Sequence, residues 1–266
     1  MPRSAARLDD IAPFHVVELL TRAHQLAAEG RDIIHMEVGE PDFPTPPAIA
    51  TFAVDAIQQG KTKYTPALGL PELRQAIADF YRQRYGVNVS ASRIVVTNGA
   101  SGALNLAFAC LANPGSEWLL ADPGYPCNRH ILRTYEGHPV AIPVGPESNF
   151  QPTPAQVAAA WNERTAGLLV ASPANPTGTL LTLPEITALA QTVRAQGGHF
   201  LVDEIYHGLT YEIDAPTACA AGDDIWVINS FSKYFQMTGW RLGWMVVPAA
   251  YVRDVEKLAQ NLTLCP

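Results

Sequence analysis

The chain has 266 residues, of which 48% are hydrophobic and only 16% are charged. A folded chain of about 300 residues buries roughly 75% of the surface that its unfolded form exposes, and this composition supplies the apolar side chains for such a core, which excludes disorder as the main state. Aspartate and glutamate outnumber lysine and arginine by 25 to 18, giving a formal charge of -7, and no basic run is visible. Nucleic acid is therefore not expected as a partner.

The first 45 residues differ in pattern from the rest of the chain. An amphipathic stretch predicts a helix over Val16–Ala28, and a short strand is expected over Ile33–Val38. The proline-rich stretch Pro41–Pro47 then interrupts regular structure. We place a domain boundary there, so that residues 1–45 form the N-terminal part of a small domain and residues 46–266 form a large domain.

In the large domain, strand-like and helix-like segments alternate. Pro71 opens a helix over Glu72–Tyr85, and Gly86 ends it. Runs rich in valine, isoleucine and leucine predict seven strands: Arg93–Thr97, Trp118–Ala121, Val140–Val144, Leu168–Ala171, His199–Val202, Ile225–Asn229 and Leu242–Val247. Further helices are expected between them, over Ala100–Ala112, Pro154–Asn162 and Pro184–Gln196. This order predicts an α/β protein of three layers, with a mostly parallel central sheet flanked by helices.

The cysteines and the N-terminal sequence indicate the cellular compartment in which the protein is expected. The four cysteines are irregularly spaced, with no C-x-x-C pair, and we expect reduced, mostly buried thiols and no bound metal. The sequence after Met1 is amphipathic and lacks the apolar segment of a signal peptide, and no apolar stretch is long enough to span a bilayer. A cytoplasmic location and no membrane partner are therefore expected.

A phosphate site is one reading of the turn after the first strand of the large domain. Ligands of an open parallel sheet bind beyond the carboxyl ends of its strands. Small residues in Gly99–Gly102 follow such a strand and open a helix, so backbone N–H groups and the Ser101 hydroxyl can face an anion. A glycine-rich turn of this kind also occurs for reasons of backbone geometry alone, and the assignment needs support from other segments.

Lys233 supplies that support, because it follows a strand within an apolar segment. An isolated lysine is most simply read as a solvated loop residue. Among apolar groups, however, its pKa falls, and the neutral amine is the form that condenses with carbonyl groups. Hydroxyls at Ser230 and Ser232 accompany it. Together with Arg241, they can bind the phosphate proposed at Ser101.

Asp203 ends a predicted strand, where a buried carboxylate needs a cation or caps a following helix. A protonated pyridine nitrogen is such a cation. Asn175 and Tyr206 can donate hydrogen bonds to a phenolate oxygen, and Tyr125 offers a face on which a ring can stack. An amine, a partner for a ring nitrogen, phenolate donors, a stacking ring and a phosphate site are what pyridoxal 5'-phosphate (PLP) requires. We therefore predict PLP as the cofactor.

Several motifs in this order carry a family resemblance. The most specific are Ser230-Phe-Ser-Lys-Tyr-Phe235, Met237-Thr-Gly-Trp-Arg-Leu-Gly-Trp244, Asn175-Pro-Thr-Gly178 and Asp203-Glu-Ile-Tyr206. Others are Val38-Gly-Glu-Pro-Asp-Phe43, Tyr64-Thr-Pro-Ala-Leu-Gly69 and Asp122-Pro-Gly-Tyr-Pro126. On these motifs the chain resembles, nearly end to end, the fold-type I PLP-dependent aminotransferases of classes I and II, in the branch similar to aspartate aminotransferases.

The resemblance implies a role for each matched position. Lys233 would carry the Schiff base, with Asp203 and Tyr206 as its catalytic companions. Gly39 and Asn175 would bind substrate. The residues implied to bind the cofactor are Lys233, Asp203, Tyr206, Asn175, Tyr125, Ala100, Ser101, Ser230, Arg241 and Tyr64. Tyr64 would reach the phosphate of a second subunit, which makes a homodimer the expected assembly.

The implied reaction moves an amino group between an L-amino acid and a 2-oxo acid. Family members usually continue beyond the point where this chain stops and carry there an arginine that grips the substrate α-carboxylate. No arginine follows Arg253, so we expect a chain truncated at its C-terminus, lacking the end of the large domain and most of the small one. Three alternatives to an aminotransferase remain. They are a C–S β-lyase of the same fold, a cyclopropane-forming synthase of the same fold, and a catalytically silent PLP-binding fragment.

Overall fold

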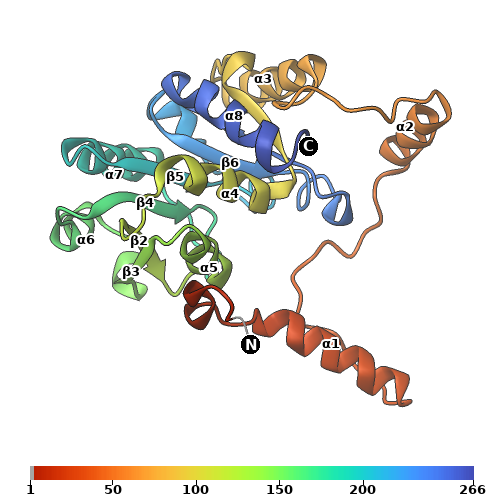
Figure 1. Cartoon of the computed structure of the whole chain (residues 1–266), viewed down its shortest axis with the longest axis horizontal. Helices are drawn as coiled ribbons and strands as arrows, with labels where there is room; N and C mark the ends of the chain where they lie inside the picture. The colour runs from red at the N-terminus through yellow and green to blue at the C-terminus, as the bar shows by residue number, and fades with distance from the viewer. Residues whose placement is uncertain (1–2) are drawn as a thin grey trace.

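Seven strands form one sheet at the centre of the computed structural model, which describes residues 3–266 (Figure 1). They lie in the order β1-β7-β6-β5-β4-β2-β3. Their bounds are Ile94–Thr97 (β1), Glu117–Asp122 (β2), His138–Pro143 (β3), Thr165–Ala171 (β4), His199–Asp203 (β5), Trp226–Ser230 (β6) and Gly243–Val246 (β7). Only β7 runs antiparallel to its neighbours β1 and β6, and the other pairs are parallel. The predicted mostly parallel sheet is confirmed, with each strand within three residues of its predicted bounds.

Helices cover both faces of this sheet, because successive strand residues point to opposite sides. Leu168, for example, belongs to the core on one face and Leu169 to the core on the other. The first face is covered by α3 (Pro71–Tyr85), α6 (Pro154–Ala160) and α7 (Leu183–Ala195). The second is covered by α4 (Gly99–Leu111), α5 (Pro126–Thr134) and α8 (Val252–Leu262). The three-layer α/β architecture is thereby confirmed, although α5 and α8 were not predicted.

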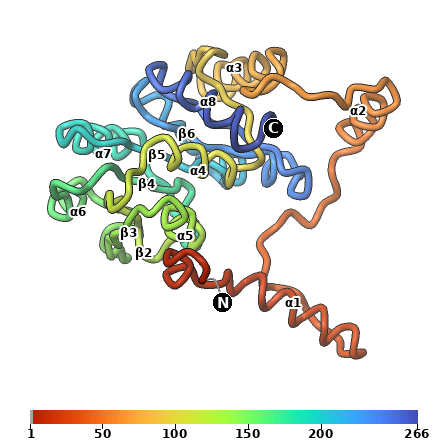
Figure 2. The backbone as a smooth tube through the Cα atoms, viewed as in Figure 1, coloured from red at the N-terminus to blue at the C-terminus, as the bar shows by residue number. Residues whose placement is uncertain are grey.

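Two helices near the N-terminus extend away from these layers (Figure 2). These helices, α1 (His15–Ala28) and α2 (Pro47–Gln58), have no buried residue, and an extended segment joins them. The predicted strand over Ile33–Val38 is wrong. A strand needs a neighbour for its backbone hydrogen bonds, and none pairs with this segment, in which Met36 is 88% exposed.

The domain boundary at residue 45 stays a prediction. The predicted N-terminal part, residues 1–45, begins with two residues that lie outside the described part of the chain. Within that part, no helix is long and apolar enough to cross a membrane. All four cysteines are free thiols, as expected. Each of them is half-buried, however, whereas most were expected to be fully buried.

Truncation of a central core residue tests the layer assignment. Leu201 of β5 is fully buried, so Leu201→Ala is expected to lower the free energy of unfolding by about 2–5 kcal/mol through lost burial and a residual cavity. Leu19→Ala on α1, where the side chain is 59% exposed, is the matched control and is expected to change it by about 0.5 kcal/mol or less. Urea denaturation of the 266-residue chain measures both, and equal losses would contradict the assignment.

Candidate active site

The sheet topology gathers the predicted site residues at one edge. Strands β4, β5 and β6 are parallel neighbours, so Asn175, Asp203 and Lys233, which follow or end them, share that edge. Because β7 is antiparallel, its first residue, Gly243, pairs with Thr97 at the end of β1 and with Ser230 at the end of β6. This pairing brings the start of α4 and the loop carrying Arg241 to the same edge.

Asp203 is a buried carboxylate that no cation partners. It is 6% exposed, its Oδ1 accepts a hydrogen bond from the Ile205 backbone N–H at 3.0 Å, and no salt bridge within residues 3–266 reaches it. Burial raises its pKa from 3.8 to about 6, opposed by the Ile205 hydrogen bond. No helix begins after it, so Asp203 caps a turn and not a helix. The carboxylate is therefore free to pair with a cationic ligand.

Asn175 and Tyr206 meet across the ends of β4 and β5. The Asn175 Nδ2 group donates a hydrogen bond of 3.2 Å to the Tyr206 hydroxyl. Burial, with a further contribution from the Asp203 charge, raises the pKa of Tyr206, so the phenol keeps its proton at neutral pH. The pair can thus offer hydrogen-bond donors to an anionic oxygen.

Lys233 is half-buried at the centre of the site. Its Nζ donates a hydrogen bond of 2.6 Å to the Gly39 carbonyl oxygen and lies 6.0 Å from the centroid of the Tyr206 ring. Burial lowers the pKa of Lys233, with a smaller lowering from Arg241, while Glu40 raises it. A larger share of neutral amine makes Lys233 a better nucleophile than a solvated lysine.

Arg241 lies against the N-terminus of α4. A Cβ atom placed on Gly99 would come within 2.6 Å of the Arg241 Nη2 atom, and the positive φ of Gly99, 69°, also favours glycine. Ala100 and the exposed Ser101 belong to the same first turn, whose N–H groups have no partner within the helix. A guanidinium beside a helix N-terminus suits a phosphate.

Ser230 has a structural role in this arrangement. Its hydroxyl is buried, lies 2.8 Å from the Ser232 hydroxyl and donates to the Leu242 carbonyl oxygen at 3.1 Å, while accepting from the Ser232 N–H. These bonds shape the loop before Lys233, and the contribution of Ser230 to a phosphate site stays a prediction. Tyr64 is not brought to the site and is 83% exposed between α2 and α3.

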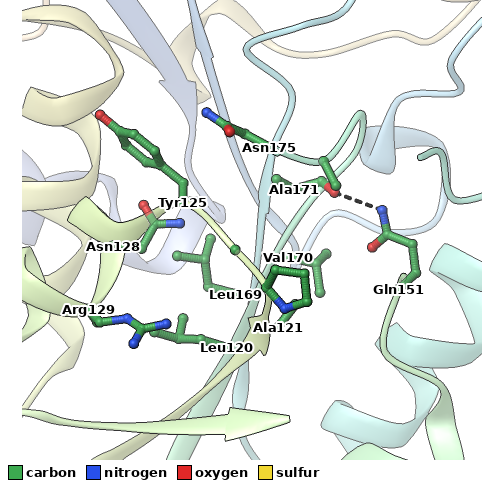
Figure 3. A pocket seen from close by; sticks show the side chains of 13 residues that line it. Leu120, Ala121, Tyr125, Asn128, Arg129, Gln151, Leu169, Val170, Ala171 and Asn175 are labelled. Atoms are coloured by element: carbon green, nitrogen blue, oxygen red, sulfur yellow. Dashed lines mark hydrogen bonds between the residues drawn. The ribbon is translucent and has the colours of Figure 1, made fainter. Parts of the chain in front are cut away.

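Two cavities border the site. A small one, of about 30 Å³, lies beside Tyr125 and is closed in part by Asn128 and Gln151, whose Nε2 donates to the Ala171 carbonyl oxygen at 3.1 Å (Figure 3). A larger one, of about 480 Å³, is bordered by Asn175 and Tyr206, and its volume lies in the range of small-molecule sites. The Asn175–Tyr206 pair therefore faces space for a ligand.

Phe14, which the sequence did not predict as a neighbour of the site, contacts Tyr125. Its ring stands edge-on to the Tyr125 ring, with centroids 5.9 Å apart and planes at 87°. The segment before it, η1 (Ala6–Asp10), packs on α5 and is held by an ion pair of 2.9 Å between Arg7 and Glu136. Nothing local in the sequence signals a contact between residues so far apart along the chain.

The residues present fit PLP on three independent grounds. Asp203 is a buried carboxylate lacking a cation, Lys233 is an amine whose pKa is lowered, and the start of α4 with Arg241 is an anion site that a side chain at position 99 would fill. An α/β fold with such a site at the carboxyl edge of its sheet defines a class of cofactor-dependent enzymes.

Comparison with known proteins places the chain within that class. The model of the family "Aminotransferase class I and II" matches residues 31–266, and the chain belongs to this family. A valine–pyruvate aminotransferase of Mycobacterium tuberculosis is 40% identical over 96% of this chain and 66% of its own length. A probable aspartate/prephenate aminotransferase of Thermus aquaticus is 34% identical over 98% of this chain and 68% of its own length.

Solved structures agree in fold. An aminotransferase from Mycobacterium tuberculosis superposes with a TM-score of 0.95 at 39% identity, covering 100% of this chain and 69% of that chain. The Thermus thermophilus aspartate aminotransferase with maleate gives a TM-score of 0.95 at 32% identity, covering 100% and 70%. The fold-type I assignment is confirmed, and the chain spans about two thirds of the length of the relatives it matches.

The unpartnered charge of Asp203 predicts a pH-dependent stability. Because its pKa is raised from 3.8 to about 6, the proton on Asp203 stabilises the fold fully below pH 3.8, and this contribution is lost as the pH rises to about 6. Asp203→Asn removes the charge. The cofactor-free variant is therefore expected to match the wild type below pH 4 and to exceed its free energy of unfolding above pH 6, by up to about 3 kcal/mol.

Urea unfolding across pH 4–8 measures this difference, with Asp55→Asn on the exposed side of α2 as the control. A constant difference between wild type and Asp203→Asn across that range would contradict the raised pKa.

Proposed function

We propose that the chain is the cofactor-binding part of a PLP-dependent aminotransferase, which moves an amino group between an L-amino acid and a 2-oxo acid. The observation that carries the proposal is that an unpartnered buried carboxylate, Asp203, and the half-buried amine of Lys233 lie at the same edge of the sheet. Membership in the aminotransferase family supports it. The four free thiols fit the reducing conditions of the cytoplasm, which we propose as the location.

Each residue has a task set by its own chemistry. PLP, when bound, supplies the electron-accepting ring that stabilises negative charge at the substrate Cα. Asp203 would keep the ring nitrogen protonated, and Asn175 with Tyr206 would donate to the ring oxygen. Lys233 would hold the cofactor through its amine, and the free amine would accept the proton from the substrate Cα.

The remaining residues place the cofactor and the substrate. Arg241 and the first turn of α4, with Ala100 and Ser101, would hold the phosphate, and Ser230 supports the same loop. The Tyr125 ring would stack on the cofactor ring. Gly39, whose carbonyl oxygen accepts a hydrogen bond from Lys233, would lie beside the substrate carboxylate.

The relatives' names guide the choice of substrates for an assay. One relative is named for valine and pyruvate, and another for aspartate and prephenate. We therefore propose L-amino acids of both kinds as donors to test. A β-lyase or a cyclopropane-forming synthase would use the same cofactor residues, but no relative named above carries such an activity, and formation of the 2-oxo acid with an intact side chain separates transamination from both.

A homodimer is part of the proposal. Helix α2 lies away from the body of the chain (Figure 1). The segment from α2 to Tyr64 exposes large apolar side chains, among them Phe52 and Ile57. Such side chains on an unpacked helix favour burial against a partner. A second copy of the chain would bury them and bring Tyr64 to the phosphate at the partner's site.

Replacing Lys233 tests the cofactor assignment. Lys233→Ala is expected to abolish the visible absorption band that PLP develops on bonding to a lysine, and to stop 2-oxo acid formation, because no other amine occupies this edge of the sheet in residues 3–266. The measurement is an absorption spectrum of the 266-residue chain with PLP, before and after valine or aspartate is added. Lys257→Ala on the surface of α8 is the control and should behave as wild type.

Three outcomes can be told apart in that spectrum. A Lys233-dependent band that changes with an amino acid supports the aminotransferase. A band that never responds indicates a silent PLP-binding fragment, and a band that persists in Lys233→Ala contradicts the assignment.

Subunit complementation tests the proposed role of Tyr64. Tyr64→Ala is expected to weaken PLP binding about tenfold by removing a hydrogen bond to a charged phosphate. Mixing this variant with Lys233→Ala should restore tight-binding sites, up to about a quarter of the total, because half of the dimers are hybrids and each hybrid holds one intact site. A titration of the absorption band measures this recovery, and its absence would contradict a site shared between subunits.

A further inference from the structure

The turn after β5 has two faces with different tasks. Asp203 and Tyr206 face the candidate active site, whereas Glu204 and His207 point into the protein, where they are 0% and 5% exposed. No step of the proposed reaction uses these two buried titratable groups. Glu204 directly follows Asp203 in the chain, and His207 directly follows Tyr206. Contacts that hold the two buried side chains in place therefore also hold the backbone that carries Asp203 and Tyr206, which we call the front of the turn.

Glu204 is clamped to the core by its side chain and its backbone. Its Oε1 accepts from the Ala218 N–H at 2.6 Å and from the Thr217 hydroxyl at 3.0 Å, and its N–H donates to the Ile228 carbonyl oxygen of β6 at 2.7 Å. The next residue, Ile205, supplies the N–H that orients the Asp203 carboxylate. The clamp on Glu204 therefore sets where that N–H stands.

His207 holds the other end of the turn in place, and its hydrogen bonds indicate whether Glu204 is protonated. Its Nε2 lies 3.1 Å from the Ser172 carbonyl oxygen and must donate to it, which leaves Nδ1 of the neutral ring as an acceptor. The Tyr85 hydroxyl lies 2.9 Å from Nδ1 and donates to it, and the Glu204 Oε2 lies 3.6 Å from the same atom. An ionised Glu204 would therefore hold its negative charge 3.6 Å from a neutral nitrogen that has no proton to offer it, and the protonated acid avoids this unfavourable contact.

We propose that Glu204 is a positioning residue that holds a proton at neutral pH, orients the turn from its buried side, and leaves Asp203 as the one ionised carboxylate of the turn, available to a cationic ring nitrogen. Two carboxyl groups on adjacent residues in a buried turn disfavour a double charge, so the one without a cationic ligand retains its proton. Burial raises the pKa of Glu204 to about 8 and lowers that of His207 to about 4, which agrees with a neutral pair.

The titratable groups around Glu204 come from the turn itself and from three other elements. They are Asp203 of β5, His207 of the turn, Tyr81 and Tyr85 of α3, and Cys219 of η4 (Ala218–Ala220), with Arg84 and Arg93 beyond Tyr85 and Cys219. None of them is a cation in contact with the Glu204 carboxyl group, since the pKa of His207 is lowered. The neutral acid is thus the state that these surroundings favour.

The cofactor-free 266-residue chain provides the first test. An infrared difference spectrum of wild type minus Glu204→Gln at pH 7 is expected to show the band of a protonated carboxylic acid, whereas the exposed control Glu163→Gln should show only carboxylate. The urea midpoint of Glu204→Gln should also rise relative to wild type between pH 5 and pH 8, because the wild type alone loses stability as a raised pKa is approached. A carboxylate band at Glu204, or a constant midpoint difference, would overturn the proposal.

PLP binding provides the second test and depends on the proposed function. Glu204→Gln, which keeps the shape and the neutral charge, should bind PLP within about threefold of wild type and leave the pH midpoint of the visible band unchanged. Glu204→Ala should weaken binding about tenfold or more and shift that midpoint, and Thr217→Val, which removes one donor to Glu204, should act in the same direction if the alanine variant does not fold.

Equal effects of the glutamine and alanine variants on PLP binding would overturn the positioning role. If the wild-type chain gives no Lys233-dependent band, the proposed function fails, while the infrared and unfolding measurements still decide the protonation of Glu204.

Discussion

The buried carboxylate of Asp203 is the constraint on which the rest of the site depends. Moving an ionised group out of water is costly, and residues 3–266 offer Asp203 one backbone N–H and no cation. A cationic ligand would remove this cost and stabilise the fold by its binding energy. The protein is thereby built so that its site is least stable when empty, and the ligand that relieves it must carry a positive charge at the position facing β5.

The same logic explains the other charges of the site. Arg241 is positive and lies at the positive end of α4, an arrangement that is unfavourable until an anion lies between them. Lys233 is half-buried beside a carbonyl oxygen, where its pKa falls. A ligand with a cationic ring nitrogen, an anionic phosphate and a carbonyl carbon satisfies all three groups at once, and no one of them alone would identify it.

Local patterns in the sequence predicted the individual strands and the motifs of the candidate site, because each strand and each motif consists of residues close together in the chain. Valine-rich runs marked the strands, and short motifs marked Lys233 and Asp203. The failures came from contacts across the chain. Ile33–Val38 has the composition of a strand but lacks a neighbour, and the Phe14–Tyr125 contact joins segments that no local pattern connects.

The sequence motif that contains Asp203 and Glu204 does not show that the two carboxyl groups have different roles. Glu204 stands beside Asp203 in the sequence, yet only the fold reveals that one carboxyl group faces the ligand and the other faces Thr217, Ala218 and His207. Alternation along the strand sends neighbouring side chains to opposite faces, and a cationic ligand that only Asp203 can meet then makes two buried carboxyl groups different in charge. For Asp203 to stay ionised beside the ligand, the adjacent buried Glu204 has to stay protonated. Consecutive residues at the end of β5 thus supply one charged and one neutral carboxyl group.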